Sequence, residues 1–300
     1  MKYTNALKTI VVFLLAAFSA EAKEGIDHFT LLAAMKEQKV RVCAEALGGH
    51  SKQCLYLNIA NNTSVPMNIT IDPAMIFRPV DSSQQDLVVM GEQVIVLAPN
   101  ESKSMSVNAF CGKSYASSPR RNTKFNFLKQ GSRGLIEAAK FINRHKLYNY
   151  IGQAAVWSFT NNKSLSNIYS TDPAYNQLSN ELVKLISKMT GKPIPEYNTV
   201  LRSYREGASG PVYNPEISKL YVDLNWTNKD LINMHVLVFK SDGTLYKEIK
   251  DGERISPKGH SLRVEFDPKK DPHDTYTVCL KDNENYVYLK KRVIVSSESE

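Results

Sequence analysis

The apolar residues of this chain change their spacing twice, and these changes constrain the fold more than any other feature of the sequence. Up to about residue 128, apolar and polar residues alternate in short runs such as Val40-Arg41-Val42 and residues 55–59. Turn residues such as Asp72-Pro73 separate the runs, and alternation between turn signals is typical of half-buried strands. The pattern predicts an antiparallel β-sandwich over residues 40–128.

Helical spacing replaces the alternation in residues 129–200. A second helical segment is expected at 148–159, and a third runs from a cap at Thr171 or Asp172 to Gly191. The first helix of the region is indicated by apolar residues at three- and four-residue intervals: Leu135, Ile136, Ala139, Phe141 and Ile142. We therefore expect a section of about three helices that packs on the first sandwich.

Alternation returns after a stretch rich in Pro and Gly, residues 201–216, which we interpret as a linker. Residues 217–296 contain about six strand-like runs, with a hairpin signal at Asp242-Gly243. This indicates a second, immunoglobulin-like sandwich, followed by an acidic tail at 297–300. The predicted fold class is mainly β with a helical section: two antiparallel β-sandwich domains separated by about three helices and a Pro/Gly linker.

The first 22 residues have the pattern of a secretory signal peptide. Lys2 and Lys8 precede an apolar run at residues 10–18, and Ala20-Glu21-Ala22 offers a cleavage site. The run is much shorter than the roughly 20 residues that cross a bilayer. We therefore predict export to the periplasm, outer membrane or cell surface, with no transmembrane segment after cleavage. Residues 23–39 then form an N-terminal segment before the first sandwich.

Charge and motif content argue against nucleic-acid binding and catalysis. The net charge is +8, but the basic residues are scattered, and the densest group is Arg120-Arg121 with Lys124. The six histidines are dispersed, without a metal-binding or hydrolase motif. The acids of residues 267–274 are interpreted as a turn rather than a calcium site, since prolines and lysines lie between them. We predict no catalytic residue, no metal, no cofactor and no nucleic acid.

Four cysteines in an exported chain make disulfides plausible. Cys43 and Cys54 flank Gly48-Gly49 symmetrically, so a two-residue turn there would place them opposite each other on paired strands. We expect these two to form a disulfide. Cys111 and Cys279 are left as a bridge between domains, as buried thiols or as reactive groups.

The stretch IGQAAVWSF, residues 151–159, resembles the reactive-glutamine motif of bacterial surface thioester domains. The resemblance implies a bond between the thiol of Cys111, which ends a predicted strand, and the side chain of Gln153. Such a bond stores an acyl group for attachment to a target nucleophile. Helix packing is the alternative interpretation, because Ile151, Ala155 and Phe159 fall on one helix stripe.

The last quarter of the chain resembles the small C-terminal sandwich of secreted Bacteroidetes proteins, including type IX sorting domains. The runs HVLVFKSDGTLYKEI, KGHSLRVEF and DTYTVCLKDNENYVYLKKRVIV carry the resemblance, with an Asp-Gly turn and a final tyrosine-containing hairpin. It implies an immunoglobulin-like fold and a cell-envelope setting.

These observations together predict a non-enzymatic protein that binds or assembles with a protein partner of the bacterial envelope, such as an outer-membrane complex. One alternative is a thioester adhesin that uses Cys111 and Gln153. Another is a secreted glycan- or peptide-processing enzyme, which would require two acidic residues facing each other in a cleft.

Overall fold

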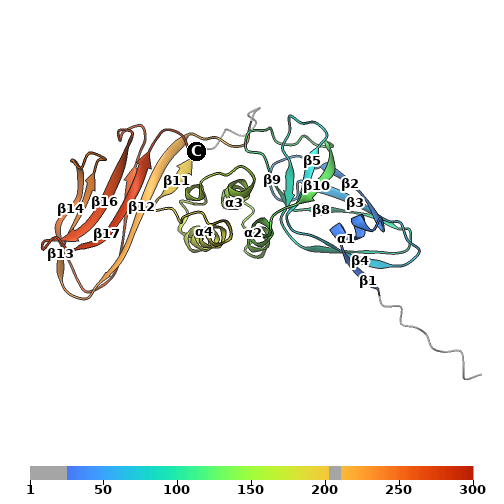
Figure 1. Cartoon of the computed structure of the whole chain (residues 1–300), viewed down its shortest axis with the longest axis horizontal. Coiled ribbons are helices and arrows are strands. Elements are labelled where there is room, and N and C mark those ends of the chain that lie inside the picture. Colours follow the sequence, from blue (N-terminus) through green and yellow to red (C-terminus); the bar gives the residue numbers. More distant parts are fainter. Residues whose placement is uncertain (1–25, 203–210, 300) are drawn as a thin grey trace, which may run out of the picture.

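The computed structural model describes residues 26–202 and 211–299. It shows an elongated molecule with one β-sandwich at each end and helices between them (Figure 1). The predicted fold class, mainly β with a central helical section, is confirmed. The predicted signal peptide, half of the predicted linker (residues 203–210) and the last residue of the acidic tail lie outside the described residues. No helix in the described ranges is both long and apolar enough to span a membrane.

The first sandwich consists of a three-stranded sheet, ordered β1-β4-β7, and a seven-stranded sheet, ordered β8-β3-β2-β10-β5-β6-β9. Its strands are antiparallel except for β1, which pairs in parallel with β4. The short helix α1 (Leu31–Lys36) follows β1, capped by Thr30, whose side chain accepts a hydrogen bond from the Ala33 N–H. The strands are β1 (Asp27–Thr30), β2 (Val40–Ala46), β3 (Leu55–Asn61), β4 (Met67–Ile71), β5 (Met75–Pro79), β6 (Leu87–Val89), β7 (Gln93–Leu97), β8 (Ser102–Val107), β9 (Ala109–Cys111) and β10 (Lys124–Gln130).

The seven-stranded sheet is covered on both faces where β5, β6 and β9 lie. Residues of one face, such as Ala109 and Cys111, belong to the core between the two sheets. Their neighbour Phe110 points the other way and belongs to a second core shared with the helices. This explains why all three residues of β9 are buried, as are all three of β6.

The helical section contains α2 (Arg133–Arg144), α3 (Tyr150–Thr160) and α4 (Asn176–Thr190), with 3-10 turns η1 (Leu165–Asn167) and η2 (Pro173–Tyr175). Side chains of Ser132 and Asn149 accept hydrogen bonds from the first turns of α2 and α3. Gly191 ends α4 with a left-handed backbone, φ 74°. Asp172, expected to cap the third helix, instead caps η2, and α4 begins only at Asn176.

The second sandwich packs a sheet ordered β11-β12-β15 against one ordered β14-β13-β16-β17. The extra strand β11 (Asn198–Leu201) pairs with the start of β12, so this domain begins within the region predicted as helical. These residues form a strand because their backbone pairs with β12. The run is too short for its alternation of apolar and polar residues to predict a strand from the sequence. The other strands are β12 (Ile217–Asn228), β13 (Ile232–Phe239), β14 (Leu245–Ile255), β15 (Lys258–Phe266), β16 (Asp274–Asp282) and β17 (Val287–Val295).

The expected hairpin at Gly48-Gly49 is wrong, and with it the proposed Cys43–Cys54 disulfide. The pairing of β2 with β3 stops at Ala46 opposite Leu55, so residues 47–54 form a longer connection. Cys43 lies opposite Asn58 on the exposed face of the sheet, whereas Cys54 is buried in the sandwich core. All four cysteines, each within the described ranges, are free.

Candidate functional site

Cys111 and Gln153, predicted from the sequence as a pair, lie in contact where α3 packs on β9. The Nε2 of Gln153 donates a hydrogen bond to the Cys111 carbonyl oxygen at 2.8 Å. The Cys111 N–H donates to the Oε1 of Gln153 at 3.2 Å. Both residues are buried, so the amide side chain takes the place of a missing neighbour strand at this sheet edge.

The contact is made through the main chain of Cys111 and not through its thiol. The Cys111 side chain belongs to the core between the two sheets, which also contains Cys54. Burial raises the pKa of the Cys111 thiol well above its ordinary value, and it raises that of Cys54 to about 12. Both thiols are therefore protonated at neutral pH, whereas the thiolate is the nucleophilic form of cysteine.

Two further amide side chains hold the segment that follows Cys111. Asn161, which ends α3, donates to the Gly112 carbonyl at 3.0 Å and accepts from the Ser114 N–H. Gln85 donates to the Ala116 carbonyl at 2.8 Å and accepts from the Lys113 N–H at 3.1 Å. We call residues 111–116, together with these three amides, the amide clamp. It satisfies buried backbone groups that no strand pairs, and this is a structural role.

Gly152 allows α3 to approach the sheet closely enough for Gln153 to reach Cys111. A Cβ at position 152 would collide with the carbonyl oxygen of Leu147 and lie 2.9 Å from the ring of Phe110. Real Cβ atoms are not found this close to their neighbours, so glycine is required here for contact rather than for conformation.

A groove of about 340 Å³, lined in part by residues of the amide clamp, lies between the first sandwich and the helices. Its one carboxylate, Asp86, is already paired with Arg78 at 3.2 Å and with Lys113 at 3.0 Å. Paired acids of the kind that a glycoside hydrolase uses do not line this groove. This groove therefore gives no support to the alternative of a glycan-processing enzyme.

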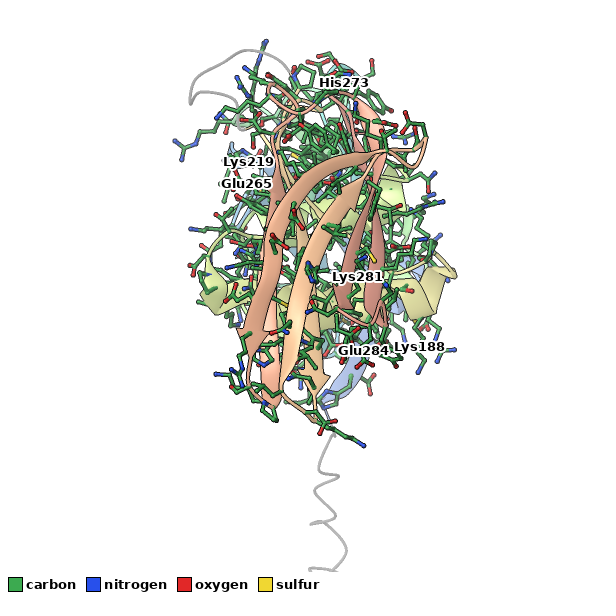
Figure 2. The ribbon with its side chains drawn as sticks, turned by 90° about the vertical axis from the view of Figure 1, so that its left-hand side faces the viewer. Lys188, Lys219, Glu265, His273, Lys281 and Glu284 are labelled. Atoms are coloured by element: carbon green, nitrogen blue, oxygen red, sulfur yellow. The ribbon has the colours of Figure 1, made fainter. Side chains whose placement is uncertain are left out.

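A second concave site, which we call the aromatic pocket, lies at one end of the second sandwich. Its volume is about 470 Å³. Figure 2 labels Glu284, which lies in the turn between β16 and β17, two residues before Tyr286. Residues of β12, of β17 and of the loops beside them line the pocket: Asn225, Trp226, Thr227, Asn228, Lys229, Asp230, Tyr286, Tyr288 and Leu289.

The aromatic residues of this pocket are held in place by one another and by a histidine. Trp226 stacks on His260, its partner across the strands, with ring centroids 5.1 Å apart. Tyr286 meets Tyr288 edge to face at 4.9 Å and remains 64% exposed. Aromatic side chains already fixed in this way lose little conformational freedom when they bind a ligand.

Two polar atoms of the aromatic pocket lack a hydrogen-bond partner within the described part of the chain: the Nε1 of Trp226 and the Oδ1 of Asn228. The Nδ2 of Asn228 donates to the carbonyl oxygens of Asp230 and Ser256, at 2.8 and 3.0 Å. Both unpartnered atoms are buried, so the surface that the pocket offers to a ligand consists of its aromatic side chains and of exposed polar side chains such as Asn225 and Thr227.

The remaining residues singled out from the sequence make contacts that support the fold. Cys279 is buried on the second sandwich and Cys111 in the first, so they do not bridge the domains. In the 267–274 stretch, Asp271 accepts hydrogen bonds from Tyr246, Lys247 and the Asp267 N–H. Two of these donors lie on β14 and one in the turn, so protein groups occupy both oxygens of this carboxylate.

Sequence reasoning missed the aromatic pocket because its walls come from strands more than 50 residues apart in the chain. Trp226 and Tyr286 are aromatic residues near strand ends, and this becomes a signal only once the pairing of the sheets is known. Searches of protein-family models and of curated proteins find no match to this chain. The site must therefore be judged from its own geometry.

Proposed function

We propose that this is an exported, non-enzymatic protein of the bacterial cell envelope that binds a partner protein through the aromatic pocket of its second sandwich. The observation that carries the proposal is the pocket itself, where exposed Tyr286 and stacked Trp226 lie beside the exposed polar side chains of Asn225 and Thr227. Tyr and Trp are the residues most enriched at the energetic centres of protein interfaces.

The chemistry of the pocket favours an extended protein segment as its ligand. A peptide unit offers one C=O and one N–H, which can pair with the exposed side chains of Asn225 and Thr227 in the lining of the pocket. An apolar side chain of the same segment would fill the space between the tyrosines and Leu289. Lys229 and Asp230 at the rim add one charge of each sign, which steers and orients a partner more than it adds affinity.

The cell-envelope setting rests on the sequence. A signal-like N-terminus and the resemblance to Bacteroidetes C-terminal sandwiches support export, an envelope or surface location and a role as an accessory subunit of an outer-membrane complex. The immunoglobulin-like fold agrees with this setting, since such sandwiches commonly present binding loops at their ends.

The test is affinity purification of the tagged chain from native envelopes, with Tyr286→Ala as the variant and Tyr115→Ala as the control. Both tyrosines are largely exposed, at 64% and 72%, but Tyr115 lies on the first sandwich beside the groove. We expect a stoichiometric partner that is lost with Tyr286→Ala and kept with Tyr115→Ala. Equal recovery from both variants would contradict the proposal.

A thioester adhesin is the second candidate, favoured by one observation: Gln153 and Cys111 are in contact. Thioester formation would join the Cys111 sulfur to the Gln153 side-chain carbon and release ammonia, so the intact mass would fall by about 17 Da. The amide clamp predicts the full mass and a Cys111 thiol that is alkylated once the chain is unfolded. Mass spectrometry of the intact protein separates the two.

A further inference from the structure

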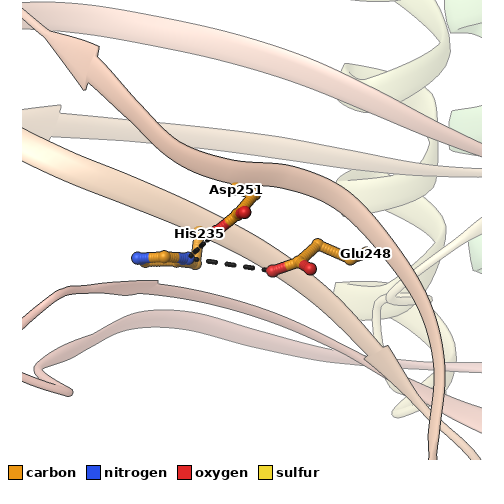
Figure 3. A group of neighbouring side chains, drawn as sticks. All are labelled: His235, Glu248 and Asp251. Atoms are coloured by element: carbon orange, nitrogen blue, oxygen red, sulfur yellow. Dashed lines mark ion pairs between the residues drawn. The ribbon is translucent and has the colours of Figure 1, made fainter.

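Three potential metal ligands converge on the outer face of the second sandwich: the Nδ1 of His235, a carboxylate oxygen of Glu248 and one of Asp251. These atoms all lie within 4.8 Å of one another. Figure 3 shows both carboxylates directed at the same edge of the imidazole ring. The distances from Nδ1 are 3.3 Å to Asp251 Oδ1 and 3.8 Å to Glu248 Oε1.

An irregularity in the strand pairing creates this convergence. Between β13 and β14, Met234 pairs with Glu253 but Val236 pairs with Lys250, so His235 faces two residues, Asp251 and Gly252. A bulge of this kind redirects a side chain that regular alternation would turn away. The left-handed backbone of Gly252, φ 61°, fits the bulge. The spacing of these residues in the sequence does not predict the site, because the bulge brings them together.

Two hydrogen bonds favour the tautomer of His235 that can bind a metal through Nδ1. The Nε2 of His235 lies 2.6 Å from the Oδ1 of Asn283, an acceptor, so Nε2 carries the proton. The Nδ1 accepts from the Gly252 N–H at 3.2 Å, so it carries a lone pair rather than a proton. Metal-binding histidines are typically oriented in this way, by a hydrogen bond from the other ring nitrogen.

Nearby positive charges do not neutralise the carboxylates. Lys250 pairs with Glu253 at 2.6 Å, and Lys281, opposite His235 on β16, donates to Asn285 at 2.8 Å. Among the described residues, no lysine or arginine forms an ion pair with Glu248 or Asp251. Two carboxylates and a nitrogen lone pair thus converge without a cation between them.

We propose that His235, Glu248 and Asp251 bind a divalent transition-metal ion, with zinc as the best match. Ligands about 2.0–2.1 Å from a tetrahedral zinc lie about 3.3–3.4 Å apart. The His235–Asp251 distance already has this value, and the His235–Glu248 distance of 3.8 Å must shorten to it. The metal replaces the Gly252 hydrogen bond at Nδ1. One nitrogen and two oxygens suit zinc better than calcium or magnesium, which prefer oxygen alone.

Such a site joins the edge strand β14 to β13 and leaves a coordination position open to solvent or to a partner's side chain. Three protein ligands with one open position is the arrangement of exposed or catalytic rather than closed structural zinc sites. The side chains of Glu248 and Asp251 are 41% and 76% exposed, so a metal could enter and leave freely. The inference does not depend on the aromatic pocket.

The test is calorimetric titration of the chelator-treated chain with zinc chloride. We expect one zinc per chain, and affinity at least about tenfold weaker in each of His235→Gln, Glu248→Gln and Asp251→Asn, with a similar loss in Asn283→Ala. The control is His260→Gln, whose ring stacks on Trp226 away from the site; its affinity should stay within about twofold of the wild type.

Imidazole nitrogen NMR gives a second readout that misfolding would not imitate. Zinc should shift the Nδ1 signal of His235 while Nε2 keeps its proton. Zinc binding of equal strength in wild type and His235→Gln would overturn the proposal. So would the absence of zinc binding by the folded wild type, which would leave the three residues as an ordinary ion-pair cluster.

Discussion

The two sandwiches differ in how their sheets are covered. In the first, the seven-stranded sheet is packed against a second sheet on one face and, along β5, β6 and β9, against helices on the other. In the second, the hydrophobic core lies between the two sheets, and the helical section contacts one sheet only locally, where Tyr169 packs on Tyr221 and Ser166 forms a hydrogen bond with Thr199. Its outer faces carry charged pairs such as Lys219 with Glu265, seen side by side on neighbouring strands in Figure 2, and Arg263 with Asp223.

This difference shows where the molecule can interact. In the covered part, polar side chains such as Gln153 and Gln85 are consumed in satisfying the backbone. In the second sandwich, exposed polar and aromatic side chains such as Asn225 and Tyr286 line a pocket. We therefore propose that the first sandwich and its helices serve as the rigid body and that the second sandwich carries the binding sites.

The largest effect should come from emptying the core between the first sandwich and the helices. Phe110→Ala removes a fully buried ring that contacts Tyr148, and we expect a loss of about 3–5 kcal/mol in the free energy of unfolding. Urea unfolding followed by circular dichroism measures it. Phe110→Leu, which keeps most of the volume, should cost much less; equal losses from both would mean that volume is not what the ring supplies.

Breaking the amide clamp should lower the free energy of unfolding by somewhat less than Phe110→Ala does. Gln153→Ala leaves the N–H and C=O of Cys111 without their partner, and each buried unpaired group costs about 1–3 kcal/mol. The same unfolding experiment measures it, with Gln177→Ala on the exposed face of α4 as the control. If both variants were equally stable, the clamp would have no structural role.

In the second sandwich, Asp271 should link stability to pH. Burial alone would raise the pKa of Asp271, but hydrogen bonds from Lys247, from the Asp267 N–H and from Tyr246 lower it below the ordinary value. This carboxylate therefore stabilises the fold above about pH 4, and that contribution is lost as the pH falls through the lowered pKa. Asp271→Asn should cost about 1–2 kcal/mol at pH 7, and the difference from wild type should shrink in strong acid. A cost that is the same at both pH values would contradict this.

The smallest effect on stability should come from the aromatic pocket. Tyr286→Ala removes a largely exposed side chain that makes one aromatic contact, so its stability should change by less than about 1 kcal/mol. Thermal unfolding monitored by circular dichroism checks this. A larger loss would show that Tyr286 supports the fold, and the binding test with this variant would then need a milder substitution such as Tyr286→Phe.

Periodicity predicted much of the fold, because apolar spacing reports directly which face of an element is buried. It located the three helices and the second sandwich, and the motif around Gln153 identified a residue pair that is in contact. Periodicity failed where the register of strand pairing determines which residues face each other. Cys43 faces Asn58 because the connection after β2 is longer than a tight turn.

The three ligands around His235 were hidden for the same reason. Regular alternation places His235 on the outer face but cannot tell that Asp251 joins it there, because the bulge in β14 has no sequence signature of its own. Strand β11 escaped prediction since only its pairing with β12 defines it. Sites made by two strands therefore become visible only when the sheets are assembled.

Site-specific photocrosslinking tests the division between rigid body and binding domain most directly. A photoreactive phenylalanine analogue would replace Tyr286 in the aromatic pocket or, as the control, Tyr115 on the first sandwich, and the native cells would be irradiated. We predict a discrete crosslinked protein adduct from position 286 and none from position 115. An adduct from position 115 alone would contradict the account and place the binding surface on the first sandwich.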